Sequence, residues 1–388
     1  MLWGKLKIVP LNQDIPYLSG NTVKKTILMN PGPVNVTDKV RDAQLRGDLC
    51  HREKEFSDLM RSIKDKLLLA FEIGQEYSAV LISGSGTAAL EMAVSSCLTP
   101  GRSLLVIQNG VYGERIGKMA DVYRMDKHAL TYGWGEPPRL EEIEQALKDN
   151  PSIEVIAMVH HETTTGLLNP LSEIAELAKQ YDKRLVVDCI SSLGGDEIDF
   201  KKYPIDFAAG TANKCIHGLP GVSFVLHRKK DLCRIKDIPA RSVYFHLAGH
   251  HKAQEQGDTL FTPAIQPHYA LDAALDELLE ETVAGRIEHY RKSADRLRNE
   301  FQSIGLELLI PEGHRSNCLT ALKLPDGISY DWLHDQLKDN GFVIYAGQGL
   351  FNNKIFRIAN MGNIHNEEFD RCLKVLKECF ITAEKTRE

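Results

Sequence analysis

The sequence predicts an α/β fold with a large unit, built on a mostly parallel, doubly wound sheet, and a smaller C-terminal α+β unit. Two observations predict the large unit. Short apolar runs without polar alternation recur along the chain, and amphipathic helical patterns separate them. A change of texture after Gln266, from this alternation to one long helical stretch, predicts the smaller unit. A chain of 388 residues suits two such units better than one small domain.

The strands of the large unit are predicted from apolar runs bounded by turn residues. Helical patterns follow several of them, as in GSGTAALEMAVSSCL after the first run, VYGERIGKMADVY after the second and LSEIAELAKQY after the third. Helices between parallel strands cover both faces of a sheet, so its strands need no polar face. The predicted strands are residues 79–83, 103–108, 154–160, 184–189, 206–210 and 222–227.

The smaller unit follows a helical stretch over residues 268–305, with a break expected near Gly285. Strand-like runs then alternate with helical patterns to the C-terminus. These runs are residues 306–310, 318–324, 342–346 and 355–360. We therefore divide the chain into an N-terminal arm (1–26), a large domain (27–284) and a small C-terminal domain (285–388).

Composition narrows the function classes. Hydrophobic residues make up 43% of the chain and charged residues 26%, as in ordinary soluble proteins. The net charge of -6 and the lack of a basic stripe argue against a nucleic-acid partner. No apolar run approaches the roughly 18 residues of a membrane span. The eight cysteines form no CxxC pair, so we expect no metal site, and without a signal or transit peptide we expect a cytoplasmic protein.

The first candidate site follows the strand 79–83. Ser83-Gly84-Ser85-Gly86-Thr87 leads into a helix, and glycines let backbone N–H groups approach an anion at a helix N-terminus. The segment is neither a P-loop nor a GxGxxG fingerprint. A phosphate cradle and a tight turn with an ordinary N-cap serine are equally compatible with it.

Two charged residues stand at the ends of later predicted strands. Asp188 closes VVD, where it either caps the next segment or pairs with a cationic ring nitrogen. Lys214 stands among small residues in AAGTANKCIHGLPG. It either extends to solvent or acts as a nucleophilic amine whose pKa is lowered by loss of water.

Polar and aromatic residues follow two further strands. HHETTTG (160–166) directs hydroxyl groups toward the carboxyl edge of the sheet. Its paired His160 and His161 would point in opposite directions on an extended chain, which argues against a shared metal. In NGVYG, Tyr112 could stack on a planar ring or belong to the core.

Taken together, these candidate sites indicate a function more specifically than any one of them does. A phosphate cradle, a stacking aromatic, a carboxylate and a lysine at the ends of different strands are the groups that pyridoxal phosphate requires. The lysine forms a Schiff base with the cofactor, and the carboxylate keeps the pyridine nitrogen protonated.

Seven stretches of this chain resemble the class V aminotransferase group of the fold-type I pyridoxal phosphate enzymes. The resemblance implies the α/β fold above, bound pyridoxal 5'-phosphate, and a homodimer with active sites at the subunit interface. The motifs HETTTG and NKCIHGLPG are most similar to those of members that convert 2-aminoethylphosphonate and pyruvate to phosphonoacetaldehyde and alanine. The stretches are LMNPGPVNVTDKV (28–40), SGSGTAALE (83–91), NGVYGER (109–115), HHETTTGLLNP (160–170), VDCISSLGG (187–195), ANKCIHGLPG (212–221) and FRIANMG (356–362).

The resemblance also implies roles for individual residues. Lys214 would be catalytic, holding the cofactor and moving a proton, and Arg357 would grip the substrate anion beside a turn at Gly32. Thr262 would reach into the phosphate site of the neighbouring subunit. The implied cofactor-binding residues are Ser85, Gly86, Thr87, Tyr112, Thr163, Asp188, Thr211, Lys214 and Thr262.

The charged segment 48–56 has no implied role. Its His51 and Arg52 are candidate second anion contacts, although a solvated helix surface explains such a run as well.

Several alternatives share parts of this pattern. An alanine–glyoxylate or serine–glyoxylate transaminase, or one for a related aminophosphonate, would use the same lysine, aspartate and arginine. A cysteine desulfurase would need a histidine where Asn213 stands and a mobile cysteine, whereas Cys318 lies in an apolar run. A nucleotide-binding oxidoreductase would need an acidic residue where Gln108 and Asn109 stand. A non-catalytic regulator would not need Lys214.

Overall fold

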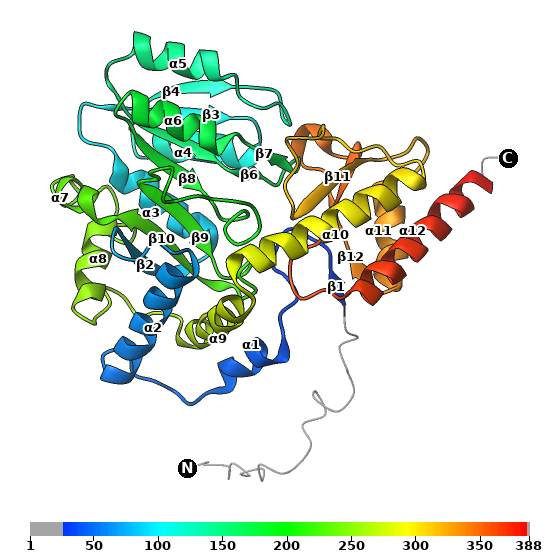
Figure 1. Cartoon of the computed structure of the whole chain (residues 1–388), viewed down its shortest axis with the longest axis horizontal. Coiled ribbons are helices and arrows are strands. Elements are labelled where there is room, and N and C mark those ends of the chain that lie inside the picture. The colour runs from blue at the N-terminus through cyan, green and yellow to red at the C-terminus, as the bar shows by residue number, and fades with distance from the viewer. Residues whose placement is uncertain (1–25, 386–388) are drawn as a thin grey trace, which may run out of the picture.

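The computed structural model describes residues 26–385 and contains a seven-stranded central sheet, in the order β2-β10-β9-β8-β5-β3-β4 (Figure 1). All of these strands are parallel except β10, which runs antiparallel to β2 and β9. The predicted mostly parallel α/β sheet is therefore confirmed. The strands are β2 (Tyr77–Gly84), β3 (Ser103–Gln108), β4 (Asp126–Thr131), β5 (Ile153–Val159), β8 (Arg184–Asp188), β9 (Phe207–Thr211) and β10 (Gly221–Arg228).

Two hydrophobic clusters cover opposite faces of this sheet. Leu104 and Val106 of β3 belong to one cluster, and Leu105 and Ile107 to the other, because successive strand residues point to opposite faces. This double burial explains why the strands read as unbroken apolar runs. The helices of this unit are α1 (Asp38–Asp42), α2 (Lys54–Ala70), α3 (Gly86–Cys97), α4 (Val111–Val122), α5 (Leu140–Asp149), α6 (Leu171–Gln180), α7 (Leu232–Ile235), α8 (Leu247–Glu255) and α9 (Ile265–Glu281).

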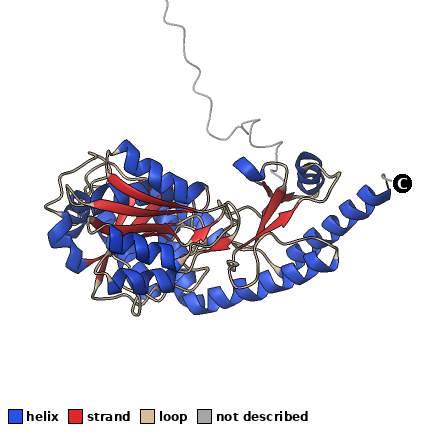
Figure 2. Cartoon of the chain, turned by 90° about the horizontal axis from the view of Figure 1, so that it is seen from above, coloured by secondary structure: helices blue, strands red, loops and turns tan. Residues whose placement is uncertain are grey.

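A smaller three-stranded antiparallel sheet, in the order β11-β14-β13, lies beside the central sheet (Figure 2). A third hydrophobic cluster, which includes Phe301, Phe356 and Phe369, packs this sheet against its helices. The arm at 1–25 lies outside the described residues, and the division at 284–285 stays a prediction. The elements are α10 (Val283–Ser303), β11 (Leu319–Lys323), α11 (Tyr330–Asp339), β13 (Tyr345–Ala346), β14 (Ile355–Ala359) and α12 (Asn366–Lys385).

Short pairings connect the remaining segments. β1 (Ile27–Leu28) pairs in parallel with β12 (Phe342–Val343), and β6 (His161–Glu162) pairs with β7 (Leu167–Leu168). The β1–β12 pair joins the start of the described chain to the smaller unit. Among residues 26–385, no helix is both long and apolar enough to cross a lipid bilayer.

Three details differ from the sequence prediction. The run 306–310 forms no strand, and only Leu308 makes a single bridge, to Leu322. The run 342–346 divides into β12 and β13, which belong to different sheets. The helix break lies at Thr282, where φ is +69°, and the Thr282 hydroxyl accepts a hydrogen bond from the Gly285 N–H at 3.0 Å.

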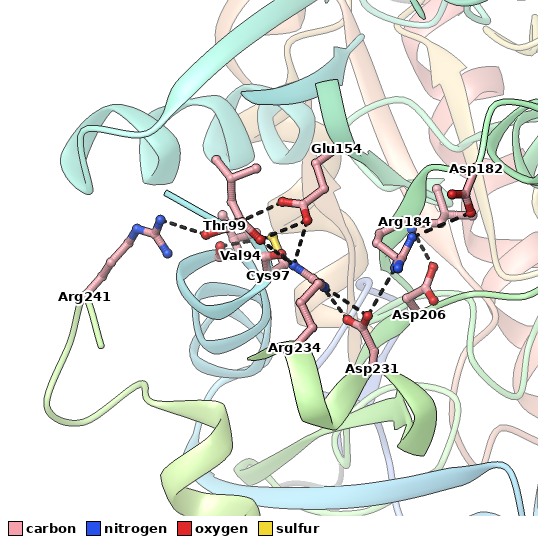
Figure 3. A network of polar contacts seen from close by, with 12 residues as sticks. Val94, Cys97, Thr99, Glu154, Asp182, Arg184, Asp206, Asp231, Arg234 and Arg241 are labelled. Atoms are coloured by element: carbon pink, nitrogen blue, oxygen red, sulfur yellow. Dashed lines mark hydrogen bonds and ion pairs between the residues drawn. The ribbon is translucent and has the colours of Figure 1, made fainter. Parts of the chain in front are cut away.

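An ionic network lies at the amino ends of the central strands β5 and β8, whereas the candidate site lies at the carboxyl ends (Figure 3). Arg234 donates two hydrogen bonds to the buried carboxylate of Asp231, at 3.0 and 2.6 Å. It also contacts Glu154 of β5 at 3.2 Å, while Arg184 of β8 bonds Asp231 at 3.1 Å. The 3-10 helix Lys229–Asp231 and α7 are thereby connected to β5 and β8, far from the carboxyl ends of these strands.

Candidate active site

A cavity of about 160 Å³ opens at the carboxyl ends of the central strands, where ligands of such sheets bind. It brings together seven of the predicted site residues, which follow four different strands. A larger cavity of about 420 Å³, beside Phe71, Phe200 and Ile287, holds none of them. The lining residues of the smaller cavity are Ser85, Gly86, Thr87, Tyr112, Arg115, His161, Asp188, Ile190, Ser191, Thr211, Asn213 and Lys214.

Lys214 enters the cavity from the turn after β9. Its Nζ donates a hydrogen bond to the backbone carbonyl of Pro31, in the turn that follows β1. Burial lowers the pKa of Lys214 from 10.5 to about 8, although its interactions with Cys215 and Asp188 act to raise it. Much of the amine is therefore neutral near pH 8, and the neutral form is the nucleophile.

Asp188 ends β8, and its side chain is buried at the cavity. Its Oδ1 accepts a hydrogen bond of 2.9 Å from the backbone N–H of Ile190. Burial raises the pKa of this carboxyl from 3.8 to about 6, and the charges of Lys214 and Arg115 oppose that rise. A cation placed against this carboxylate would lower its pKa again and would gain a strong ion pair.

Ser85, Gly86 and Thr87 form the N-terminus of α3 at the cavity. Ser85 is the N-cap residue, but its hydroxyl makes no capping hydrogen bond and so is available to a ligand. A Cβ added to Gly86 would lie 2.8 Å from the Ile190 side chain, so only glycine fits beside that residue. The Thr87 hydroxyl accepts a hydrogen bond of 3.1 Å from Arg115. Hydroxyl groups, a helix N-terminus and a guanidinium together suit a phosphate group.

Tyr112 lies in the first turn of α4, with the Arg115 guanidinium 4.7 Å from its ring centroid. The buried carboxylate of Glu162 accepts hydrogen bonds from the backbone N–H groups of Tyr112 and Gly113, both at 3.1 Å. Burial raises the pKa of Glu162 to about 7. Glu162 thus fixes the start of α4, and with it the position of the aromatic ring.

Four predicted residues lie outside the cavity lining. The Thr163 hydroxyl is buried and has no hydrogen-bond partner among residues 26–385, and the Thr163 carbonyl accepts a 2.8 Å hydrogen bond from Arg357. Arg357 also donates two hydrogen bonds to the Ala346 carbonyl, at 3.0 and 2.6 Å.

Thr262 is exposed and lines a separate small cavity beside Phe261. Gly32 has a φ of +94°, and a Cβ there would lie 2.8 Å from Lys214 Cδ.

The cavity residues fit pyridoxal phosphate by the chemistry of their side chains. Lys214 supplies the amine, Asp188 a buried carboxylate, Tyr112 an aromatic face and Ser85 an uncommitted hydroxyl at the start of a helix. Thr211, implied to aid phosphate binding, donates a hydrogen bond of 2.8 Å to Asn213 Oδ1 at the same cavity. The aldehyde, ring nitrogen, ring face and phosphate of the cofactor therefore each have a candidate partner.

The sequence patterns indicated no role for Arg115 or Glu162, and for His161 they raised only the question of a metal ligand. Arg115 stands three positions after Tyr112, so helical spacing places both on one face of α4, and this spacing was a usable signal. The Glu162 contacts join segments 50 residues apart and follow only from the tertiary structure. His51 lies outside the cavity lining, as does Arg52, which bonds Asp258 and the Thr259 carbonyl.

Known proteins resemble this chain over most of its length. The family described as aminotransferase class-V matches residues 39–352. The chain is 34% identical over 357 residues to a 2-aminoethylphosphonate--pyruvate transaminase of Phocaeicola vulgatus, covering 90% of this chain and 98% of that protein. It is 35% identical over 350 residues to the protein of the same name from Bacillus cereus, covering 89% and 95%. An alanine--glyoxylate aminotransferase structure from Nostoc sp. superposes with a TM-score of 0.86 at 27% identity, covering 93% and 97%.

Proposed function

Because the chain belongs to the class V aminotransferase family, we propose that it transfers the amino group of 2-aminoethylphosphonate to pyruvate, giving phosphonoacetaldehyde and L-alanine. The observation that carries the transaminase chemistry is the meeting of Lys214 and Asp188 in one cavity with a phosphate-compatible helix N-terminus. The choice of substrate is supported by two relatives named 2-aminoethylphosphonate--pyruvate transaminase, which match about nine-tenths of the chain. The reaction is reversible in principle, and we propose the same site for both directions.

We propose that pyridoxal 5'-phosphate occupies the cavity, where it supplies an electron-accepting ring that stabilises charge on the substrate carbon. Ser85, Gly86, Thr87 and Thr211 would hold its phosphate group. Asp188 would pair with the ring nitrogen, and Tyr112 would cover one face of the ring. Lys214, with its lowered pKa, would accept the proton lost by the amine-bearing carbon of the substrate and would deliver it to the aldehyde carbon of the cofactor.

Arg357 would bind the substrate anion. The guanidinium is buried, its three hydrogen bonds all go to neutral carbonyls, and among residues 26–385 no carboxylate lies within ion-pair distance of it. A buried cation without a counter-ion is costly, so a phosphonate or carboxylate would be its natural partner. The same arginine would therefore serve the amine donor in one half-reaction and pyruvate in the other.

An alanine–glyoxylate or serine–glyoxylate transaminase is the second candidate. The observation that favours it is the close superposition on the Nostoc enzyme. It would use the same lysine and aspartate but a carboxylate-bearing amine, so the two candidates differ in the anion that the donor presents to Arg357.

We also propose a homodimer in the cytoplasm. Leu45 and Val243 are more than 80% exposed, and Thr262 is exposed on the same chain, as an interface residue would be before assembly. Thr262 would complete the phosphate site of the second subunit. Sedimentation equilibrium of the purified protein tests this, and a monomer that retains full activity would refute it.

The decisive experiment adds single amines to the protein loaded with pyridoxal phosphate and follows the near-visible absorbance of the bound cofactor. With 2-aminoethylphosphonate we expect the band to decay and to return when pyruvate is added. Alanine should also make the band decay, because it is the amino donor of the reverse reaction. Serine and glyoxylate therefore serve as the pair that distinguishes the two candidate functions. If serine converts the cofactor and 2-aminoethylphosphonate does not, the second candidate is correct. Lys214→Ala should remove the band itself.

A further inference from the structure

His161, a residue that lines the cavity, has an unpaired ring nitrogen among the described residues. Its side chain is fully buried and lines the cavity that holds Lys214 and Asp188. The Nε2 atom has no hydrogen-bond partner within the part of the chain that the structure describes. Buried polar atoms are almost always paired in proteins, so an unpaired one in a residue that lines a cavity indicates a missing ligand atom.

The other ring nitrogen shows which hydrogen-bonding role Nε2 can take. Nδ1 lies 3.2 Å from the Ser191 carbonyl oxygen, which can only accept a hydrogen bond. It also lies 3.0 Å from Ser316 Oγ, whose single hydrogen is donated to Asp196 Oδ2 at 2.7 Å. Both neighbours therefore require the proton on Nδ1.

Asp196 holds this arrangement in place. Its second oxygen accepts a hydrogen bond of 2.7 Å from the backbone N–H of Asn317, so the carboxylate is fixed on both sides. Burial lowers the pKa of His161 to about 3, and the ring is neutral in the physiological range. A neutral imidazole protonated on Nδ1 presents a lone pair on Nε2, so His161 offers the cavity a hydrogen-bond acceptor.

The cofactor assigned to this cavity contains few groups that could donate to that acceptor. Its phosphate and carbonyl oxygens accept hydrogen bonds, and its protonated ring nitrogen would face Asp188. The ring hydroxyl is the donor that remains. Thr163, which the resemblance placed among the cofactor-binding residues, does not line the cavity, whereas His161 does.

We propose that His161 Nε2 accepts a hydrogen bond from the ring hydroxyl of bound pyridoxal phosphate, and that Ser316 and Asp196 fix the imidazole in the tautomer this requires. The inference rests on the proposed cofactor but not on the choice of amino donor. Ser316 precedes β11, so the smaller unit would take part in setting the electronic state of the ring.

The consequence is measurable without any substrate. A neutral nitrogen that accepts a hydrogen bond from the ring hydroxyl stabilises the protonated form of that hydroxyl. The cofactor with a protonated hydroxyl absorbs at shorter wavelength, and wild-type protein should hold more of it than a variant without the acceptor. In His161→Leu the ratio of the long-wavelength to the short-wavelength band, at fixed pH, should rise about 3- to 10-fold, as expected for loss of one ordinary hydrogen bond. His161→Gln, which keeps an acceptor oxygen, should restore much of the wild-type ratio.

His160→Leu is the matched control, because His160 is the adjacent buried histidine and does not line the cavity. Its ratio should equal that of the wild type. Equal ratios in wild type, His161→Leu and His160→Leu would overturn the inference, as would a change in His160→Leu of the same size. If His161→Leu fails to fold, the His161→Gln and His161→Asn pair decides by the same ratio. Failure of the proposed function shows separately, as wild-type protein that takes up no cofactor or ignores 2-aminoethylphosphonate.

Discussion

Arg357 Nη1 donates a hydrogen bond of 2.8 Å to the backbone carbonyl of Thr163. This bond joins β14 of the smaller sheet to the segment after β6, across 194 residues of sequence. The guanidinium is thereby oriented before any substrate arrives, so little conformational entropy remains to be lost when an anion binds.

Replacing Arg357 by lysine should impair substrate binding and leave cofactor binding intact. Lysine keeps the charge but cannot make three carbonyl bonds and still present a planar fork to an anion. We expect kcat/KM for 2-aminoethylphosphonate to fall on the order of 100-fold, with the cofactor absorbance unchanged. The exposed Arg139→Lys is the control. A loss below about threefold would remove Arg357 from substrate recognition.

The rate at which the cofactor-free protein captures pyridoxal phosphate should rise with pH. Burial lowers the pKa of Lys214 to about 8, and only the neutral amine attacks the aldehyde. From pH 7 to pH 9 the neutral fraction grows about tenfold and then levels off, and the capture rate should follow it. Stopped-flow absorbance measures this rate. A profile that still climbs steeply between pH 9 and 10.5 would indicate an ordinary lysine.

The sequence predicted the central strands because their residues are buried on both faces. It did not predict β4, an edge strand in which no residue is buried, so its apolar content is low. Seven predicted site residues meet in the cavity, since each follows a strand end that topology brings to one edge. The roles of Glu162 and His161 could not be predicted, because their partners come from distant segments such as the Tyr112 turn and Ser316.

Gly32→Ala should weaken cofactor capture more than it weakens folding. Gly32 has a φ of +94°, and its new Cβ would lie 2.8 and 2.9 Å from Lys214 Cδ and Cε. The lysine side chain is the more mobile partner, so it should be displaced from its position. We expect cofactor affinity to fall at least about tenfold, with the backbone strain costing about 1–2 kcal/mol of stability. Gly74→Ala is the control, because a Cβ at Gly74 meets nothing within 4 Å. Equal affinities in the two variants would contradict the displacement of Lys214.

Asp231→Ala should destabilise the protein and leave each folded molecule fully active. Burial raises the pKa of Asp231, but Arg234 and Arg184 outweigh it and hold that pKa below 3.8. The stabilisation is therefore complete above that value and is lost as pH falls below it. Removing the carboxylate leaves two partly buried guanidinium groups without this partner (Figure 3). We expect a loss of about 3 kcal/mol in the free energy of unfolding at pH 7, measured by urea denaturation.

The same substitution tests whether the two edges of the central sheet act independently. The network lies at the amino ends of the strands, and the cavity lies at their carboxyl ends. Because Asp231 contacts no cavity residue, kcat and the absorbance of the bound cofactor should stay at wild-type values below the unfolding transition. The exposed Glu76→Ala, which removes a 3.7 Å contact with Arg228, should change the unfolding free energy by less than about 0.5 kcal/mol. A fall in kcat of Asp231→Ala at full folding would show that strain passes along β8 from Arg184 to Asp188.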